Sequence, residues 1–170
     1  MKRLVIVNGA MGAGKTAVCK ELLALAPPAA LLDGDWCWTM NPFQVTAETK
    51  ALVLDNIVHI LQNFLRCPAY ETVIFCWVLH RQELLDELLA RLDTGGAQVR
   101  CFTLMPTPAA LEAHLQRDIA AGKRTPDILA RSRSYLPLYD ALDTEKMVVD
   151  SQTPGETAGE ILARLRETED

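Results

Sequence analysis

The segment Gly9 to Thr16, near the start of the chain, has the residue types and the spacing of a phosphate-binding loop. It reads Gly-Ala-Met-Gly-Ala-Gly-Lys-Thr and matches the pattern G-x-x-x-x-G-K-[ST] in full. Glycines let backbone N–H groups turn inward around an anion, in conformations that a Cβ atom would obstruct. Lys15 adds a positive charge, and Thr16 adds a hydroxyl that can bind Mg²⁺. The segment therefore predicts a cradle for the phosphates of a nucleotide.

The sequence on either side of this loop fits the same prediction. The pattern requires a strand before it and a helix after it, and the apolar run Leu4–Val7 and a helical run from Lys15 meet that condition. The positive end of the helix dipole would point at the anion, and Lys15 would reach the β- and γ-phosphates of ATP. A glycine-rich turn with a chance lysine is the alternative. We expect the nucleotide to contact Gly9, Ala10, Met11, Gly12, Ala13, Gly14, Lys15, Thr16 and Ala17.

Two carboxylates flank a glycine in Asp33-Gly34-Asp35, directly after a second short apolar run. Ligands of open α/β sheets bind beyond the carboxyl ends of the strands, which is where this segment is expected. One carboxylate can hold the Mg²⁺ water shell, and the other can accept the proton of an attacking hydroxyl. Gly34 would permit a sharp bend between them. The alternative is an ordinary polar β-turn, since Asp and Gly are common turn residues.

An acidic chain concentrates positive charge in one stretch, residues 117–133. Arginine suits the negative charge that phosphoryl transfer spreads over oxygen atoms, and Gly122 breaks the helical pattern as a mobile lid requires. We expect Arg117 and Arg124 to take part in catalysis, and we leave Arg131 and Arg133 unassigned. A solvated helix face is the alternative. The five basic residues of the stretch are Arg117, Lys123, Arg124, Arg131 and Arg133.

Apolar and aromatic side chains follow the second carboxylate at Trp36, Trp38, Met40 and Phe43. They fit a substrate pocket, because ligand sites are mainly apolar with a few placed polar groups. They fit equally well as core residues beneath the long helix expected from Thr46. The sequence leaves these two interpretations open.

Short apolar runs alternate with longer helical runs along the chain, and this order predicts a parallel sheet covered by helices on both faces. Thr107-Pro108 and Thr125-Pro126 are helix start signals, and Thr153 with Glu156 forms a capping box for the last helix. The expected strands are 4–7, 30–32, 72–79, 99–105 and 147–149. The expected helices are 15–25, 46–65, 81–92, one from 107, one from 125, and 153–166.

Length and composition bound the possible functions. A chain of 170 residues predicts one domain, residues 1–170, and 49% hydrophobic residues are enough for a packed core. A net charge of -5 argues against a nucleic-acid partner. The five cysteines contain no CxxC pair, so they indicate reduced thiols. Because no signal peptide and no apolar stretch of bilayer length is present, we expect a soluble cytoplasmic protein without a membrane partner.

The phosphate-binding loop (a Walker A motif) followed closely by Leu32-Asp33-Gly34-Asp35 resembles the small-molecule kinases of the P-loop fold, such as shikimate kinase, gluconate kinase, adenylylsulfate kinase and chloramphenicol phosphotransferase. The resemblance implies a three-layer α/β P-loop NTPase fold, with a five-stranded parallel sheet in the order 2-3-1-4-5. It also implies a helical lid at about residues 117–133 whose arginines contact ATP. Thr16 and Asp33 would hold Mg²⁺, and Asp35 would bind or deprotonate the substrate.

The chain departs from many P-loop proteins at the end of the third strand. That strand ends Trp77-Val78-Leu79-His80, where a Walker B aspartate is usual. Arg81 follows, and nucleoside monophosphate kinases similarly place an arginine there to hold the acceptor's phosphate.

The sequence leaves three functions open. It identifies neither the phosphoryl acceptor nor the oligomeric state. The first is an ATP- and Mg²⁺-dependent kinase that phosphorylates the hydroxyl of a small molecule. The second is a nucleoside monophosphate kinase-like enzyme, favoured by Arg81 together with Arg66. The third is a nucleotide-binding switch protein without kinase chemistry, favoured by the missing Walker B aspartate.

Overall fold

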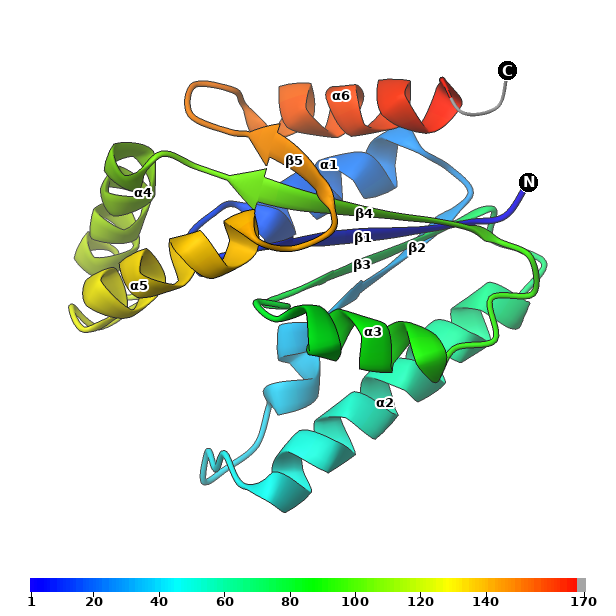
Figure 1. Ribbon diagram of the computed structural model, residues 1–170, viewed down its shortest axis with the longest axis horizontal. Coiled ribbons are helices and arrows are strands. Elements are labelled where there is room, and N and C mark those ends of the chain that lie inside the picture. The colour runs from blue at the N-terminus through cyan, green and yellow to red at the C-terminus, as the bar shows by residue number, and fades with distance from the viewer. Residues whose placement is uncertain (168–170) are drawn as a thin grey trace.

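A five-stranded sheet, all parallel, forms the centre of the computed structural model, which describes residues 1–167 (Figure 1). The strand order is β2-β3-β1-β4-β5, as expected. β1 therefore pairs with β3 on one side and with β4 on the other. The strands are β1 (Arg3–Gly9), β2 (Ala29–Asp33), β3 (Thr72–Trp77), β4 (Gln98–Met105) and β5 (Glu145–Val148).

Helices cover both faces of the sheet, which confirms the three-layer prediction. α1 and α6 lie on one face, and α2 and α3 lie on the other (Figure 1). Alternate residues of β1 supply both cores, because Val5 and Val7 pack on the α1 side while Leu4 and Ile6 pack on the α2 side. The helices are α1 (Lys15–Leu25), α2 (Ala47–Arg66), α3 (Gln82–Ala90), α4 (Pro108–Ala120), α5 (Ile128–Asp140) and α6 (Pro154–Arg166).

Most helix starts lie where the capping signals place them. The Thr107 hydroxyl accepts from the Ala110 amide at 3.3 Å, and Thr153 and Glu156 form the expected capping box. The second start signal is wrong by two residues, since α5 begins at Ile128 rather than at Pro126. The Thr125 hydroxyl donates to the Asp127 carboxylate instead of capping a helix. Thr125-Pro126 therefore belongs to the turn that joins α4 to α5.

α4 and α5 lie beyond the carboxyl end of the sheet and pack against the glycine loop (Figure 1). Their shared core contains Ala10 of that loop together with Leu115 and Tyr139, all of which are buried. Within residues 1–167, no helix is both long enough and apolar enough to cross a membrane. The loop is thus held between the sheet and this helical pair.

A 3₁₀ helix, η1 (Gly34–Trp38), follows β2 and carries the second carboxylate. We expected Gly34 to be needed for a sharp bend, but its φ is not positive. The reason for the glycine is a close approach instead, since a Cβ atom there would lie 2.5 Å from Cγ of Trp77. The small residue lets the Trp77 ring pack against η1.

We predict that Gly34→Ala lowers the free energy of unfolding by about 1–3 kcal/mol, because the added methyl group must displace the indole of Trp77. Chemical denaturation would measure the change. Gly159→Ala in α6 is the matched control, since nothing lies within 4 Å of the added Cβ. The control should be neutral or stabilising by up to about 1 kcal/mol. Equal effects of the two substitutions would contradict this explanation of Gly34.

Candidate nucleotide and acceptor site

The glycine loop has a backbone conformation that depends on its glycines. Gly12 and Gly14 have φ values of 87° and 92°, which L side chains rarely adopt. A Cβ atom on Gly12 would lie 2.6 Å from the side chain of Leu115, so this glycine also permits close packing against α4. Nothing lies within 4 Å of a Cβ built on Gly14, directly before α1. The start of α1 therefore faces space that a phosphate can enter.

Two polar side chains that were not among the predicted site residues fix the loop from the other side. Ser132 of α5 is buried, and its hydroxyl donates to the Met11 carbonyl at 3.0 Å. His114 of α4 places Nδ1 3.2 Å from the Gly12 carbonyl. A serine and a histidine within helical patterns give no sequence signal for these contacts. The α4–α5 pair is thus bonded to the cradle as well as packed on it.

Lys15, the first residue of α1, folds back over the loop. Its half-buried Nζ donates to the carbonyls of Gly9 and Ala10, both at 2.9 Å. Burial lowers the pKa of Lys15, while the negative charges of Asp35 and Asp33 oppose that shift. The ammonium group therefore lies inside the cradle, near both carboxylates of the Asp33–Asp35 segment.

Asp33 ends β2 and joins the loop to η1. The Thr16 hydroxyl donates to Oδ2 of Asp33 at 2.7 Å, and the Asp35 amide donates to Oδ1 at 3.0 Å. Asp33 is only 5% exposed, so its carboxylate is held in one place. The hydroxyl and the carboxylate of this pair are the oxygen ligands that Mg²⁺ prefers, and Mg²⁺ usually takes its other ligands from phosphates and water. The donor set thus fits the predicted metal site.

That fit depends on a nucleotide. Among residues 1–167, no group of three or more His, Cys, Asp or Glu residues is arranged to hold a metal ion. Two protein oxygens bind Mg²⁺ weakly without the phosphate oxygens that complete its octahedron. The site is therefore suited to a metal that arrives with a nucleotide, and the assignment of Thr16 and Asp33 as its ligands stays a prediction.

Asp35 is solvent-exposed and lies two residues beyond Asp33, within η1. Partial desolvation raises the pKa of Asp35, and the nearby charge of Asp33 raises it further. The positive charges of Lys15 and Arg124 oppose this shift in pKa. A carboxylate placed this way is close to the cradle, and its higher pKa suits it to accept a proton.

The predicted lid arginines lie in different surroundings. Arg124 follows the break at Gly122, and its Nε donates to the Asp118 carboxylate at 3.2 Å. Its charge acts on both Lys15 and Asp35, so the structure brings Arg124 toward the cradle. Arg117 is exposed on α4, where its Nε donates to the Ala113 carbonyl at 3.3 Å. A catalytic role for Arg117 stays a prediction.

The two unassigned arginines lie away from the acceptor side. Arg131 is 3.9 Å from the Asp127 carboxylate, one turn away on α5. Arg133 lines a separate small hollow between α4 and α5. Arg131 also lines a second hollow together with Gly122 and Arg124. Both arginines therefore stay without an assigned role.

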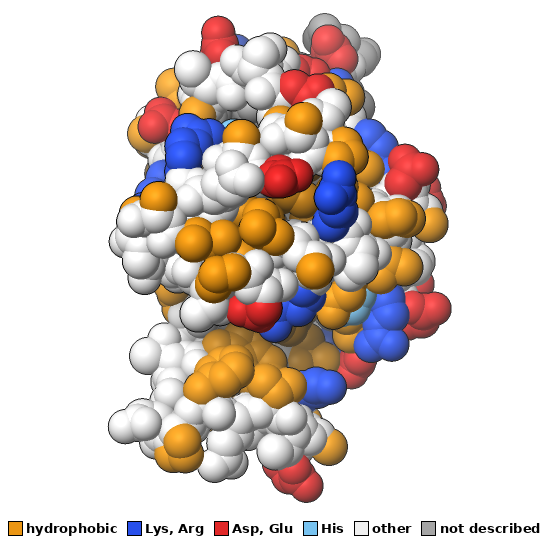
Figure 2. Space-filling model, turned by 90° about the vertical axis from the view of Figure 1, so that its left-hand side faces the viewer, with side chains coloured by type: hydrophobic (Ala, Val, Ile, Leu, Met, Phe, Trp, Pro, Cys, Tyr) orange, Lys and Arg blue, Asp and Glu red, His pale blue; other side chains and the backbone are white. Residues whose placement is uncertain are grey.

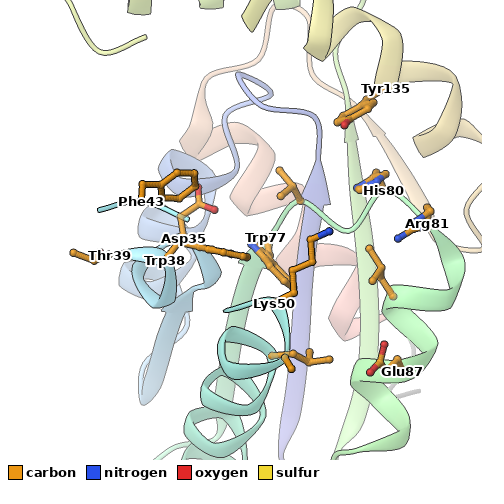
Figure 3. Close-up of a pocket in the computed structure, with 14 residues that line it drawn as sticks. Asp35, Trp38, Thr39, Phe43, Lys50, Trp77, His80, Arg81, Glu87 and Tyr135 are labelled. Atoms are coloured by element: carbon orange, nitrogen blue, oxygen red, sulfur yellow. The ribbon is translucent and has the colours of Figure 1, made fainter. Parts of the chain in front are cut away.

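A cavity of about 950 Å³ lies beside Asp35, between η1, the start of α2, the end of β3 and α5. Figure 2 shows a hollow in the face that looks along the carboxyl ends of the strands, with hydrophobic and basic side chains at its edges. Figure 3 shows the side chains that line the cavity. Its volume falls at the upper end of the range of small-molecule pockets.

The apolar side chains that follow Asp35 lie in different surroundings. Trp38 and Phe43 line the cavity, with ring centroids 6.0 Å apart. Met40 packs against the core on the α2 side of the sheet. Trp36 is 56% exposed and lies outside the cavity lining. The pocket interpretation thus fits Trp38 and Phe43, and the core interpretation fits Met40.

The segment after β3 forms another wall of the cavity, and no acid lies there, as the sequence indicated. Trp77 and Arg81 line the cavity, and the Asn8 side chain holds this segment to β1 by donating to the Leu79 carbonyl at 3.1 Å. The His80 ring stacks on Tyr135 of α5, with centroids 4.9 Å apart and an interplanar angle of 1°. α5 therefore contacts both the cradle and the cavity.

Arg66 does not join Arg81 in the cavity. Only the first part of α2, at Lys50, Ala51 and Leu54, lines it, whereas Arg66 is the last residue of that helix. The sequence-based pairing of Arg66 with Arg81 is therefore not supported by their positions. Lys50, which had no predicted role, is the cation of α2 that reaches the cavity.

Comparisons with known proteins identify the fold. No protein-family model matches the chain, and no curated protein matches it at a significant level. Among solved structures, a sugar kinase from a Janibacter species matches with a TM-score of 0.67 and 19% identity, over 98% of this chain and 95% of that one.

Two further solved structures match over nearly their whole lengths. A gluconokinase from Sinorhizobium meliloti has a TM-score of 0.69 and 17% identity, covering 98% of this chain and 94% of its own. A shikimate kinase from Acinetobacter baumannii in complex with shikimate has a TM-score of 0.62 and 19% identity, covering 99% and 95%. Together with the strand order and the glycine loop, these matches show that the chain has the fold of the P-loop small-molecule kinases.

Proposed function

We propose that this protein is an ATP-dependent kinase that transfers the γ-phosphoryl group to a hydroxyl of a small molecule. One observation carries the proposal: Asp35 lies between the phosphate cradle and the cavity. Its charge acts on Lys15 of the cradle, and its carboxylate forms part of the cavity wall. A group that accepts a hydroxyl proton during phosphoryl transfer must lie at such a junction.

The nucleotide side of the site is built from the loop and α1. The loop amides, the positive end of α1 and Lys15 would hold the β- and γ-phosphates. Thr16 and Asp33 would hold Mg²⁺, which neutralises charge on the phosphate oxygens when it is bound. Arg124, and Arg117 if α4 moves, would stabilise the negative charge of the transition state.

The acceptor side requires one proton transfer and one bond exchange. The acceptor hydroxyl gives its proton to the Asp35 carboxylate, and its oxygen forms a bond to the γ-phosphorus. The bond between the γ-phosphorus and the β,γ-bridging oxygen breaks, and ADP leaves with that electron pair. Because α4 and α5 pack on the loop, they are placed to exclude water from this step.

An acceptor phosphate, as in nucleoside monophosphate kinases, is the second candidate because Arg81 lines the cavity. Electrostatics favour the hydroxyl, however. An acceptor phosphate would have to lie at the cradle end of the cavity, beside the carboxylate of Asp35. A negatively charged phosphate and a carboxylate in contact repel each other, whereas a hydroxyl can donate a hydrogen bond to Asp35.

The first prediction of this function concerns nucleotide binding. Lys15→Ala should weaken the binding of Mg·ATP about 10–100-fold in titration calorimetry, because it removes charge-assisted hydrogen bonds to the phosphates. Lys20→Ala is the matched control, since Lys20 is an exposed lysine of the same helix. Unchanged binding of Mg·ATP by the Lys15 variant would contradict the proposal that the glycine loop and Lys15 hold the phosphates.

The second prediction concerns the acceptor. A coupled assay of ADP release, run with Mg·ATP across a panel of small alcohols and nucleoside monophosphates, should show release with alcohols and none with any monophosphate. The reason is the repulsion between an acceptor phosphate and the carboxylate of Asp35, which lines the cavity. Release with a monophosphate alone would favour the second candidate.

The third prediction concerns Asp35 with an alcohol that supports turnover. Asp35→Asn should reduce kcat about 10²–10⁴-fold while leaving the affinity for ATP nearly intact, because an amide cannot accept the proton. The substitution preserves shape, and the hydrogen bond from the Asp35 backbone amide to Asp33 remains. Asp143→Asn, at an exposed position, should leave kcat unchanged. Full turnover by the Asp35 variant would exclude Asp35 as the base.

A further inference from the structure

The cavity beside Asp35 has walls that are largely aromatic and aliphatic. Four aromatic side chains from three parts of the chain line it, and leucines of α2 and α3 fill the space between them. Aromatic faces pack well against planar rings but leave most hydroxyls without a hydrogen-bond partner. The aromatic residues are Trp38, Phe43, Trp77 and Tyr135.

Apolar surface continues outside the cavity at its mouth. Phe43 lines the cavity and is still 65% exposed, so its ring forms part of the outer surface as well. Figure 2 shows hydrophobic side chains at the edge of the hollow. An aromatic ring that is open to solvent beside a cavity offers a ligand further apolar contact area. The mouth therefore favours an apolar ligand.

Two cations reach the same cavity from different helices. Lys50 of α2 and Arg81 at the start of α3 line it, and both are exposed. Within residues 1–167, neither side chain takes part in a hydrogen bond or an ion pair. Other arginines of the chain, such as Arg91 and Arg164, are paired with carboxylates. Lys50 and Arg81 are thus available to an anionic ligand.

Within the cavity, the carboxylate of Asp35 lies apart from the cations of Lys50 and Arg81. Figure 3 shows Asp35 on one side of the cavity with Trp38 and Phe43, and Arg81 on the other side. The ammonium group of Lys50 points from below into the space between them. Glu87 also lines the cavity on the Arg81 side, so two cations there face one acid. A ligand with an anionic group would bind with that group away from Asp35.

We propose that the phosphoryl acceptor is an alcohol with a planar apolar body and an anionic group. The hydroxyl faces Asp35, the ring lies between the aromatic walls, and the anionic group faces Lys50 and Arg81. This assignment rests on the proposed function, because it takes Asp35 as the group that meets the acceptor hydroxyl. A cavity of about 950 Å³ has room for a ligand larger than a single six-membered ring.

A polyol acid of the same charge fits these walls poorly. Each hydroxyl buried against an aromatic or leucine side chain loses its hydrogen bonds to water and gains none in return. A planar ring loses no hydrogen bonds and gains contact with Trp38 or Phe43. The walls therefore select for the ring, and the cations select for the charge.

Three probes separate these features. The compound 6-(hydroxymethyl)-2-naphthoate has the ring, the hydroxyl and the carboxylate; 2-naphthalenemethanol lacks the carboxylate; gluconate lacks the ring. Calorimetry with the full chain and a non-hydrolysable Mg·ATP analogue should give the tightest binding for the naphthoate. The neutral alcohol should bind roughly tenfold more weakly, as expected for the loss of one charge-assisted contact. Gluconate should bind more weakly than either.

Variants test which side chains cause these differences. Lys50→Gln with Arg81→Gln should bring the affinity for the naphthoate down to that for 2-naphthalenemethanol, without changing the latter. Arg66→Gln is the control, since Arg66 is an exposed cation of α2 outside the cavity. Phe43→Ala, at a position that is 65% exposed, should weaken both naphthyl probes equally.

Two results would overturn the acceptor class: gluconate binding as tightly as the naphthoate, or an unchanged ratio of the naphthyl affinities in the Lys50/Arg81 variant. An ADP-release assay with Mg·ATP separates this failure from that of the kinase proposal. ADP release with gluconate but not with the naphthyl alcohols would overturn the acceptor class and leave the kinase. Naphthoate binding without ADP release from any alcohol would overturn the kinase and leave the ligand class of the cavity.

Discussion

The buried carboxylate of Asp33 is the point on which the site depends. One oxygen accepts from the Thr16 hydroxyl of the loop, and the other accepts from the Asp35 amide of η1. A single side chain at the end of β2 therefore links the start of α1 to Asp35. It also places a carboxylate beside Thr16, although β3 ends without one. The proposed metal site would take its carboxylate from β2, so it does not require an acid after β3.

The fold was largely predictable because its signals are local. The apolar runs, the Thr107 and Thr153 caps and the glycine loop each depend on a few adjacent residues, and the structure confirms them. The strand order came from the resemblance to known kinases, since periodicity says nothing about which strands are neighbours. The predicted start of α5 was wrong because the Thr125 hydroxyl donates to the Asp127 carboxylate instead of capping a helix.

The site was predictable only where its residues are close in sequence. Sequence motifs identified Lys15, Thr16 and the Asp33–Asp35 pair as candidates. No motif marks Lys50 or Tyr135, and only the folded structure shows that they line the cavity. The wall of the cavity combines residues from η1 to α5, so no short window of sequence contains it. Gly34 shows the same limit, because its neighbour Trp77 is distant in the chain and close in space.

α5 contacts both halves of the site through side chains one turn apart. The Ser132 hydroxyl bonds the loop at Met11, and Tyr135 stacks on His80 at the cavity. If a ligand at the glycine loop were to move α5, the wall of the cavity at Tyr135 would move with it, and the reverse would also hold. Thermodynamic reciprocity then requires that each ligand change the affinity for its companion by the same factor. The order in which the two ligands enter would leave that factor unchanged, since binding free energies depend only on the initial and final states.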